Sequence, residues 1–300
     1  MRIGILSRGP QLYSTRSLYQ AGLRRGHDMM VIDHTRCQFV VDDVHPEIYF
    51  EDLSLSDLDA VIPRIGSSVT LLGAALLHQF ELVGVFTLTR GNALLQARDK
   101  LRCLQKLAAK GLRVPGTAFV THGSELQGLV HQLGGFPVVI KLLESTHGVG
   151  VMLAENMRSA ETTIEAFQKL NERVIVQEFI REAQGADIRA FVVGSRVVAS
   201  MKRQARSGEF RSNLHRGASA SPQQLTTEEH HAVVQAAQTM GLDVAGVDLL
   251  RSERGPLIME VNASPGLEGI ELVTGVDIAE RIIQYLENTY PLFKERKRKS

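Results

Sequence analysis

The sequence contains few of the features that mark secreted, membrane or zinc-binding proteins. It has only two cysteines in 300 residues, Cys37 and Cys103, which form neither a CxxC pair nor a Cys/His cluster. This excludes a zinc site recognisable from sequence and fits a reducing compartment. The start of the chain is too short an apolar run for a signal peptide, and no stretch approaches the length of a membrane span. We therefore expect a soluble, cytoplasmic protein.

An excess of charge of one sign is also lacking. The formal net charge is +1, so no general field attracts nucleic acid or a membrane surface. The exception is the basic tail, residues 291–300, where five Lys or Arg and one Glu follow from Lys294 onward. Such a run is most often a solvated, disordered end. With 44% hydrophobic residues, the chain can bury a large core divided over two or three structural units.

Strand and helix patterns alternate in the first third of the chain. Apolar runs predict strands at 2–6, 29–33, 60–63 and 84–87, with helical spacing around 13–25 and 71–82. This alternation favours a parallel sheet with crossover helices, that is, an α/β domain. A further helix follows at 100–110, with Gly111 at the position of a C-cap.

Hairpins replace this alternation from Thr117 onward. Two strands flank a glycine-rich loop, and two further hairpins follow, the first with a two-residue Gly194-Ser195 turn suited to type II′ geometry. Helices are expected near 277–287 and after two capping boxes, Ser124 with Gln127 and Thr226 with Glu229. The fold class is therefore α/β plus α+β, with mainly antiparallel strands in the second part.

The stretch Ile258–Gly266, IMEVNASPG, places Glu260 and Asn262 on one face of a strand. If Glu253–Gly255 forms a three-residue hairpin loop, Ser252 pairs with Pro256 and Asp248 lies opposite Glu260. Two adjacent carboxylates repel unless a cation or a proton lies between them. Oxygen ligands without His or Cys favour Mg²⁺ over zinc. The alternative is an ordinary solvated face of an antiparallel strand.

A magnesium site with few carboxylates usually shares its ion with substrate phosphates. The chain has neither a Walker A sequence nor a GxGxxG motif. It has Lys141 on a strand, followed by the loop ESTHGVG. The backbone N–H groups of such a loop can bind phosphate, with Lys141 as a point charge. The alternative is a plain hairpin turn with a lysine that extends to solvent.

These residues occur together in an order typical of one family. Lys100, Lys141 with its loop, QEFI, Asp187, RSNLHRG, Asp248 and MEVNASPGLEGIE resemble the ATP-grasp carboxylate–amine ligases, and over nearly the whole chain the RimK-type ribosomal-protein glutamate ligases. The resemblance implies an ATP-grasp fold. It has an N-terminal α/β pre-ATP-grasp domain (1–98), a central lobe with the glycine-rich phosphate loop (99–180) and a C-terminal lobe with the metal site (181–290), followed by the basic tail.

The resemblance also implies roles for individual residues. ATP is expected to contact Lys100, Lys141, Glu178, Phe179, Asp187, Arg211, Ser212 and Asn213. Two magnesium ions, replaceable by manganese, are expected on Asp248, Glu260 and Asn262. Substrate residues are expected to be Arg64, Arg216, Ser264 and Gly266. Ser145 and His147 stand where the family pattern has Gly and Gln.

The implied reaction is phosphorylation of a carboxylate by ATP to an acyl phosphate, which an amine then attacks to form an amide. Such catalysis depends on positioning and on neutralising phosphoryl charge, for which we expect Lys141 and, at the oxyanion, Arg203. The resemblance implies that L-glutamate is added to the C-terminal glutamate of a small-subunit ribosomal protein by a homotetramer without direct nucleic-acid binding. Glutamate carries two carboxylates, so its pocket needs cations such as Arg64, Arg203 and Arg216.

Two other functions remain open at this stage. One is an ATP-grasp ligase that joins an amino acid to a carrier protein or a coenzyme. The other is a non-catalytic ATP-binding module. The set of Asp248, Glu260 and Asn262 argues against the second, because passive nucleotide binding needs fewer ligands.

Overall fold

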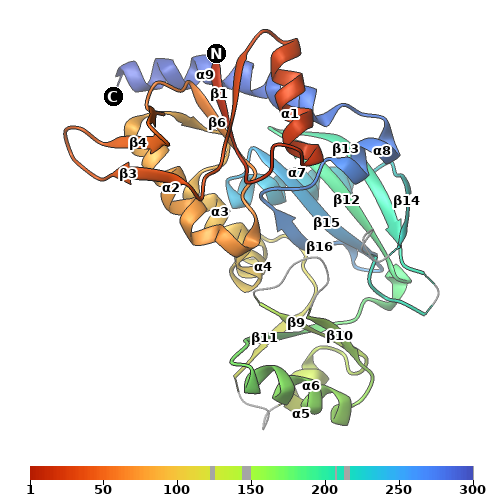
Figure 1. Cartoon of the computed structure of the whole chain (residues 1–300). Helices are drawn as coiled ribbons and strands as arrows, with labels where there is room; N and C mark the ends of the chain where they lie inside the picture. Colours follow the sequence, from red (N-terminus) through yellow and green to blue (C-terminus); the bar gives the residue numbers. More distant parts are fainter. Residues whose placement is uncertain (122–125, 144–149, 207, 213–216, 300) are drawn as a thin grey trace.

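The computed structural model describes residues 1–121, 126–143, 150–206, 208–212 and 217–299. The N-terminal part contains a parallel sheet with the order β2-β1-β6-β7, as the alternating pattern predicts. Its strands are β1 (Arg2–Leu6), β2 (Asp28–Ile32), β6 (Ala60–Pro63) and β7 (Phe86–Thr87). The helices that accompany it are α1 (Tyr13–Arg24), α2 (Thr70–Val83) and α3 (Gly91–Arg98), with a 3-10 turn η1 (Ser67–Val69) before α2. Figure 1 shows this part with α1 and the last helix on one side of the sheet and α2 and α3 on the other.

A small antiparallel sheet leaves the N-terminal part as an arm. It consists of β3 (Cys37–Val40), β4 (Glu47–Phe50) and β5 (Leu53–Ser54). The sequence analysis did not identify these strands, because each has four residues or fewer and most of their side chains are only half-buried.

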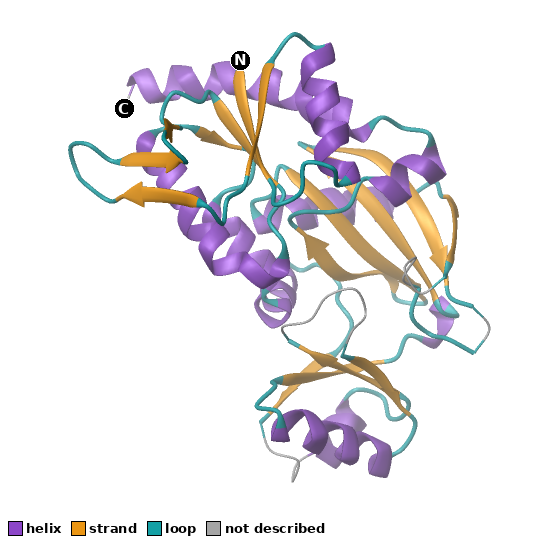
Figure 2. Cartoon of the chain, in the orientation of Figure 1, coloured by secondary structure: helices purple, strands orange, loops and turns teal. Residues whose placement is uncertain are grey.

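The central lobe is an antiparallel sheet with the order β10-β9-β11-β8. Its elements are β8 (Thr117–Val120), α5 (Leu126–Gln132), β9 (Val138–Leu142), β10 (Val151–Ala154), α6 (Met157–Lys169) and β11 (Val174–Glu178). Both helices cover the sheet face turned away from the rest of the molecule (Figure 2). The lobe has its own hydrophobic core, whose members all lie between residues 120 and 176.

The C-terminal part contains a five-stranded antiparallel sheet with the order β14-β13-β12-β15-β16. Its strands are β12 (Ala186–Val193), β13 (Arg196–Gln204), β14 (Ser219–Pro222), β15 (Val244–Ser252) and β16 (Gly255–Asn262). The associated helices are α4 (Lys100–Ala109), the turn η3 (Arg181–Ala183), α7 (Thr227–Met240), α8 (Glu268–Thr274) and α9 (Ile278–Lys299). Two hydrophobic clusters contain residues of both this part and the N-terminal part, so the two pack as one body.

The two hairpins of this sheet confirm most of the predicted register. Gly194 and Ser195 form the turn between Val193 and Arg196, and Gly194 has a φ of +62°, the positive angle that a type II′ turn requires at this position. A Cβ at Gly194 would also lie 2.5 Å from the ring of Tyr285, so this position admits only glycine.

The loop predicted for the second hairpin is one residue too long, and a β-bulge compensates for the difference in register. Gly255 has a positive φ and pairs with Ser252, the position we expected for Pro256. The register then shifts between Asp248 and Leu249, which leaves Met259 as an extra residue on β16. Asp248 therefore lies opposite Glu260, as the sequence predicts.

The expectation of a disordered basic tail is also wrong. The predicted helix at 277–287 continues as α9 to Lys299, through Pro291. Phe293 packs edge-on against Phe86 of β7, with ring centroids 5.2 Å apart. Lys297 donates a hydrogen bond to the carbonyl of Gly84. These contacts hold the helix against the N-terminal sheet. No described helix combines the length and apolar character needed to cross a membrane.

The capping box at the start of α7 is present as predicted. The Thr226 hydroxyl accepts from the Glu229 backbone N–H at 3.2 Å, and the Glu229 carboxylate accepts from the Thr226 N–H at 2.8 Å. Glu229 is buried and also binds Arg251.

We expect Thr226→Ala to lower the free energy of unfolding by about 1 kcal/mol, because the first turn of α7 loses its cap. Urea unfolding measures this value. As a control, Thr162→Ala removes a hydroxyl on the exposed face of α6 and should change stability by less than about 0.5 kcal/mol. An equal loss in both variants would show that the cap does not stabilise α7.

Candidate functional site

One cavity of about 880 Å³ brings together the candidate residues. It is bounded by the N-terminal part, the central lobe and the five-stranded sheet. The cavity is lined by Arg64, Lys100, Lys141, Glu178, Phe179, Asp187, Arg203, Arg211, Ser212, Asp248, Glu260, Asn262, Ser264 and Gly266. Asn213 and Arg216, like Ser145 and His147, lie outside the described residues.

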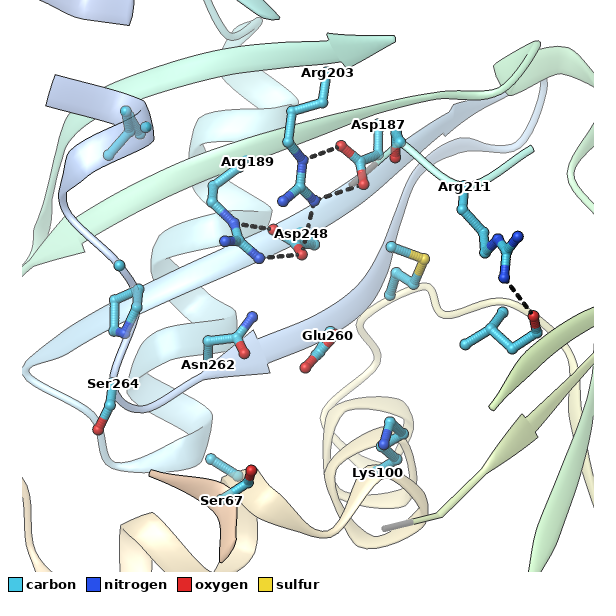
Figure 3. A pocket seen from close by; sticks show the side chains of 18 of the residues that line it. Ser67, Lys100, Asp187, Arg189, Arg203, Arg211, Asp248, Glu260, Asn262 and Ser264 are labelled. Atoms are coloured by element: carbon cyan, nitrogen blue, oxygen red, sulfur yellow. Dashed lines mark hydrogen bonds and ion pairs between the residues drawn. The ribbon is translucent and has the colours of Figure 1, made fainter. Parts of the chain in front are cut away.

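Two aspartates and two arginines face one another on the cavity side of the five-stranded sheet (Figure 3). Asp187 is the pairing partner of Arg203 across β12 and β13, and Arg189 is the partner of Asp248 across β12 and β15. Because directly opposed residues share a face, the sheet register places all four together.

The ion pairs within this group are close and nearly dry. Arg189 binds both oxygens of Asp248, at 2.7 and 2.6 Å, and Arg203 binds both oxygens of Asp187 at the same two distances. Nη2 of Arg203 also lies 2.9 Å from Asp248. Burial alone would raise the pKa of Asp248, but the charges and hydrogen bonds of both arginines hold that pKa at about 2. The four charges balance inside the protein.

Glu260 and Asn262 carry side-chain oxygens that can bind a metal ion without a change in the position of either side chain. They lie beside Asp248 on the same face of the hairpin and project into the cavity (Figure 3). Asp248 already binds two guanidinium groups, so it can contribute to a metal only by sharing an oxygen with them. Within the described ranges, no three His, Cys, Asp or Glu side chains form a metal-binding group. The set therefore fits a hard cation that takes further oxygens from a bound phosphate.

Lys141 and Lys100 make the opposite side of the cavity basic. Lys141, on β9, donates to the Gln177 side-chain oxygen at 2.6 Å, and Lys100 donates to the Leu143 carbonyl at 2.9 Å. Burial lowers the pKa of Lys141 to about 8. Lys100 adds to this shift, and the nearby carboxylates, Glu260 first, oppose it. This side of the cavity therefore has the positive charge that the predicted phosphate contacts require.

The other residues expected around ATP connect the two lobes. Glu178 accepts hydrogen bonds from the Gly116 N–H at 2.6 Å and from Arg254 at 2.5 Å. Arg211 binds Glu209 and reaches the Val151 carbonyl on β10 at 3.2 Å. Ser212 hydrogen-bonds to Asp187, and Phe179 packs edge-on against Phe210. Their roles toward ATP stay predictions.

Arg64 links the N-terminal sheet to the loop after β16. It follows β6 directly, and its Nη2 donates to the Pro265 carbonyl at 2.7 Å. Ser264 and Gly266 lie in the same loop and also line the cavity. Arg64 therefore lies at the carboxyl end of a parallel strand, where α/β domains place ligands.

The sequence analysis missed Arg189, Gln177 and Arg98, which also line the cavity. A signal existed for Arg189, because it stands two residues after Asp187 and must share its face. Gln177 similarly belongs to the QEFI motif. No sequence pattern points to Arg98, which reaches the site only through the packing of α3.

Comparisons with known proteins identify related chains over nearly the full length. Residues 97–286 match the RimK-like ATP-grasp domain, and residues 1–94 match the RimK PreATP-grasp domain. A probable alpha-L-glutamate ligase of Ectopseudomonas mendocina is 56% identical over 287 residues, which cover 96% of this chain and 95% of the relative. The one of Aliivibrio fischeri is 55% identical over 289 residues, 96% of each chain.

Solved structures with lower identity share the fold. The ATP-grasp ligase PsnB complexed with minimal precursor, Mg and ADP has a TM-score of 0.76 and 19% identity, with 96% of this chain and 98% of that chain covered. D-cycloserine synthetase DcsG has a TM-score of 0.71 and 19% identity, with 97% of this chain and 100% of that one covered.

The pKa of Lys141 leads to a pH-dependent prediction for nucleotide binding. Because this pKa is lowered to about 8, Lys141 is charged below that pH and loses its charge as pH rises through it. We expect ATP affinity of the free enzyme to fall above about pH 8, and Lys141→Gln to remove this dependence and slow turnover on the order of a hundredfold.

Calorimetric titration with ATP across this pH range checks the prediction. Lys202→Gln is the matched control, because Lys202 precedes Arg203 on β13 and points to the opposite sheet face. A Lys141→Gln variant with the affinity and pH profile of the wild type would mean that Lys141 does not bind the phosphates.

Proposed function

Because the chain belongs to the RimK-like ATP-grasp family, it is an ATP-dependent ligase, and we propose that it adds L-glutamate to the C-terminal glutamate of a small-subunit ribosomal protein. The full-length similarity to probable alpha-L-glutamate ligases supports glutamate as the amino acid. The observation that carries the proposal is one cavity that is lined by lysines, carboxylates and arginines together.

The residues of this cavity suit the parts of the two substrates. Lys100 and Lys141 bind the phosphates of ATP, and the segment around Glu178 and Phe179 binds its base. Asp248, Glu260 and Asn262 hold magnesium, which neutralises phosphate charge when bound. The acceptor carboxylate takes the terminal phosphoryl group, with ADP as leaving group, and becomes an acyl phosphate.

The second step forms the amide. The amine of glutamate attacks the acyl carbon, the bond from that carbon to the phosphate oxygen breaks, and the amine gives a proton to solvent as phosphate leaves. Arg203 stabilises the oxyanion of the tetrahedral intermediate. Asp187 and Asp248 occupy its Nε and Nη2, which fixes the guanidinium plane and leaves Nη1 to donate.

A flexible, acidic C-terminus fits this cavity as the acceptor. Such a tail can enter as an extended chain, and a site with several guanidinium groups attracts its carboxylates. The rival acceptor, a carboxylate on a carrier protein or a coenzyme, uses the same chemistry and differs only in the molecule that supplies the carboxylate.

We expect Glu260→Gln to keep the fold and to lose most ligase activity, on the order of a hundredfold or more, because one formal charge at the metal is removed. ADP release at saturating magnesium measures the effect. Glu253→Gln, on the exposed turn of the same hairpin, is the control and should retain the wild-type rate. Unchanged turnover of Glu260→Gln would sink the metal assignment.

Intact-mass analysis tests the acceptor. After incubation with enzyme, ATP, magnesium and L-glutamate, the ribosomal protein should gain one or more glutamyl masses. The same protein truncated before its C-terminal glutamate should gain none. If the full-length protein gains no mass while another carboxylate consumes ATP readily, the rival ligase function is the correct one.

A further inference from the structure

Two arginines on the N-terminal side of the cavity form no salt bridge within the described part of the chain. Nη2 of Arg64 donates to the Pro265 carbonyl at 2.7 Å, and Nη2 of Arg98 donates to the Ile65 carbonyl at 2.6 Å. Both partners are neutral backbone groups. Arg98 is the last residue of α3 and is bound to the residue that follows Arg64, so the two guanidinium groups share one corner of the cavity.

The electrostatics of this corner favour an anion. Burial and, to a smaller extent, the charge of Arg98 together lower the pKa of Arg64 to about 10. Burial also lowers the pKa of Arg98, against the attraction of Glu260. Buried cations are normally paired, because the loss of hydration is otherwise uncompensated. A bound anion would compensate both arginines at once.

The same cavity contains hydrogen-bond donors without a partner. Nε of Arg98, Nδ2 of Asn262 and Oγ of Ser264 are buried and have no partner within the described part of the chain. The two nitrogens can only donate, and the hydroxyl can also donate. Buried polar groups without partners are uncommon in folded proteins, and here three of them line one cavity. All three can donate a hydrogen bond to the oxygen atoms of an anion.

The position of Arg64, Arg98 and Ser264 relative to the expected ATP site indicates which anion binds there. Ser264 lies on the far side of Asn262 and Glu260 from Lys100 and Arg211 (Figure 3). The phosphates of ATP have their own cations on the Lys100 side. The acceptor carboxylate must reach those phosphates to react. A non-reacting carboxylate of the incoming amino acid can lie beyond the metal-binding residues, and its two oxygens match a guanidinium group.

We propose that Arg64, Arg98, Asn262 and Ser264 form a subsite that holds a carboxylate of the incoming amino acid, and that Arg98 selects for this carboxylate. The inference rests on the proposed function and extends it to a residue that the sequence does not identify. Asn262 can serve both the metal and this subsite, since its amide carries one acceptor and one donor group.

Steady-state kinetics of Arg98→Gln tests the subsite. We expect KM for L-glutamate to rise at least about tenfold, the scale for losing one charged hydrogen-bond partner, with KM for ATP within about twofold of wild type. Arg98→Lys should recover part of the loss. Arg90→Gln is the charge-matched control, because Arg90 precedes the same helix, is exposed and does not line the cavity.

Because Arg98 also supports the Ile65 carbonyl, a second measurement is independent of turnover. In the presence of ADP and magnesium, L-glutamate should raise Tm of the wild type and of Arg90→Gln, and should not raise Tm of Arg98→Gln. An unchanged KM for glutamate in Arg98→Gln, together with a wild-type Tm response, overturns the proposal. An equal rise of KM for ATP also overturns it, because the anion would then be phosphate.

L-Glutamine as the alternative substrate identifies the carboxylate. If the subsite holds the side-chain carboxylate, Arg98→Gln loses the preference for glutamate over glutamine. If it holds the α-carboxylate, both amino acids weaken alike. Failure of the proposed function is separate: the wild type would then use another amino acid, and the same comparison of Arg98→Gln with Arg90→Gln would be made with that substrate.

Discussion

The charge-balanced group of Asp187, Arg189, Arg203 and Asp248 is the interaction on which the site depends. Its members come from three neighbouring strands, and the pairing register alone brings them to one face. A slip of one residue on any strand would move a charge to the opposite face, away from its partners. Removal of one partner from a buried pair typically costs about 3–5 kcal/mol, because the other charge is left uncompensated. The network therefore fixes the register as well as the orientation of Arg203.

The buried charges of the cavity occur in two arrangements. The four-membered group is neutral by itself and hydrogen-bonded throughout. Arg64 and Arg98 instead lack a carboxylate partner among the described residues, and Lys141 has a neutral amide. The first arrangement fixes the orientation of its members, whereas the second leaves positive charge without a full counter-charge. The lowered pKa values of Lys141 and Arg64 express the same division, because burial without a full counter-charge disfavours the cationic form.

The sequence patterns correctly predicted the features that depend on side-chain periodicity and on the pairing of neighbouring strands. The parallel N-terminal strands, both hairpins and the pairing of Asp248 with Glu260 follow from alternation and turn chemistry. The last pairing was correct although the loop count was not, because the bulge at Met259 offsets the error. What sequence could not provide depends on packing between distant segments. Arg98 reaches the cavity only through the position of α3, and α9 keeps its helical form through Phe86 and Gly84.

Because the central lobe has a separate hydrophobic core, we expect its backbone amides to exchange hydrogen independently of those in the rest of the protein. The N-terminal and C-terminal parts share two clusters, so their amides should open together, whereas the amides of β8 to β11 depend on a smaller core. In the proposed function a nucleotide contacts Lys141 on the small core and Lys100 on the larger body, so its binding couples the opening of the two. We expect binding to slow exchange throughout the lobe, including α5 and α6, which lie on the sheet face turned away from the rest of the molecule (Figure 2).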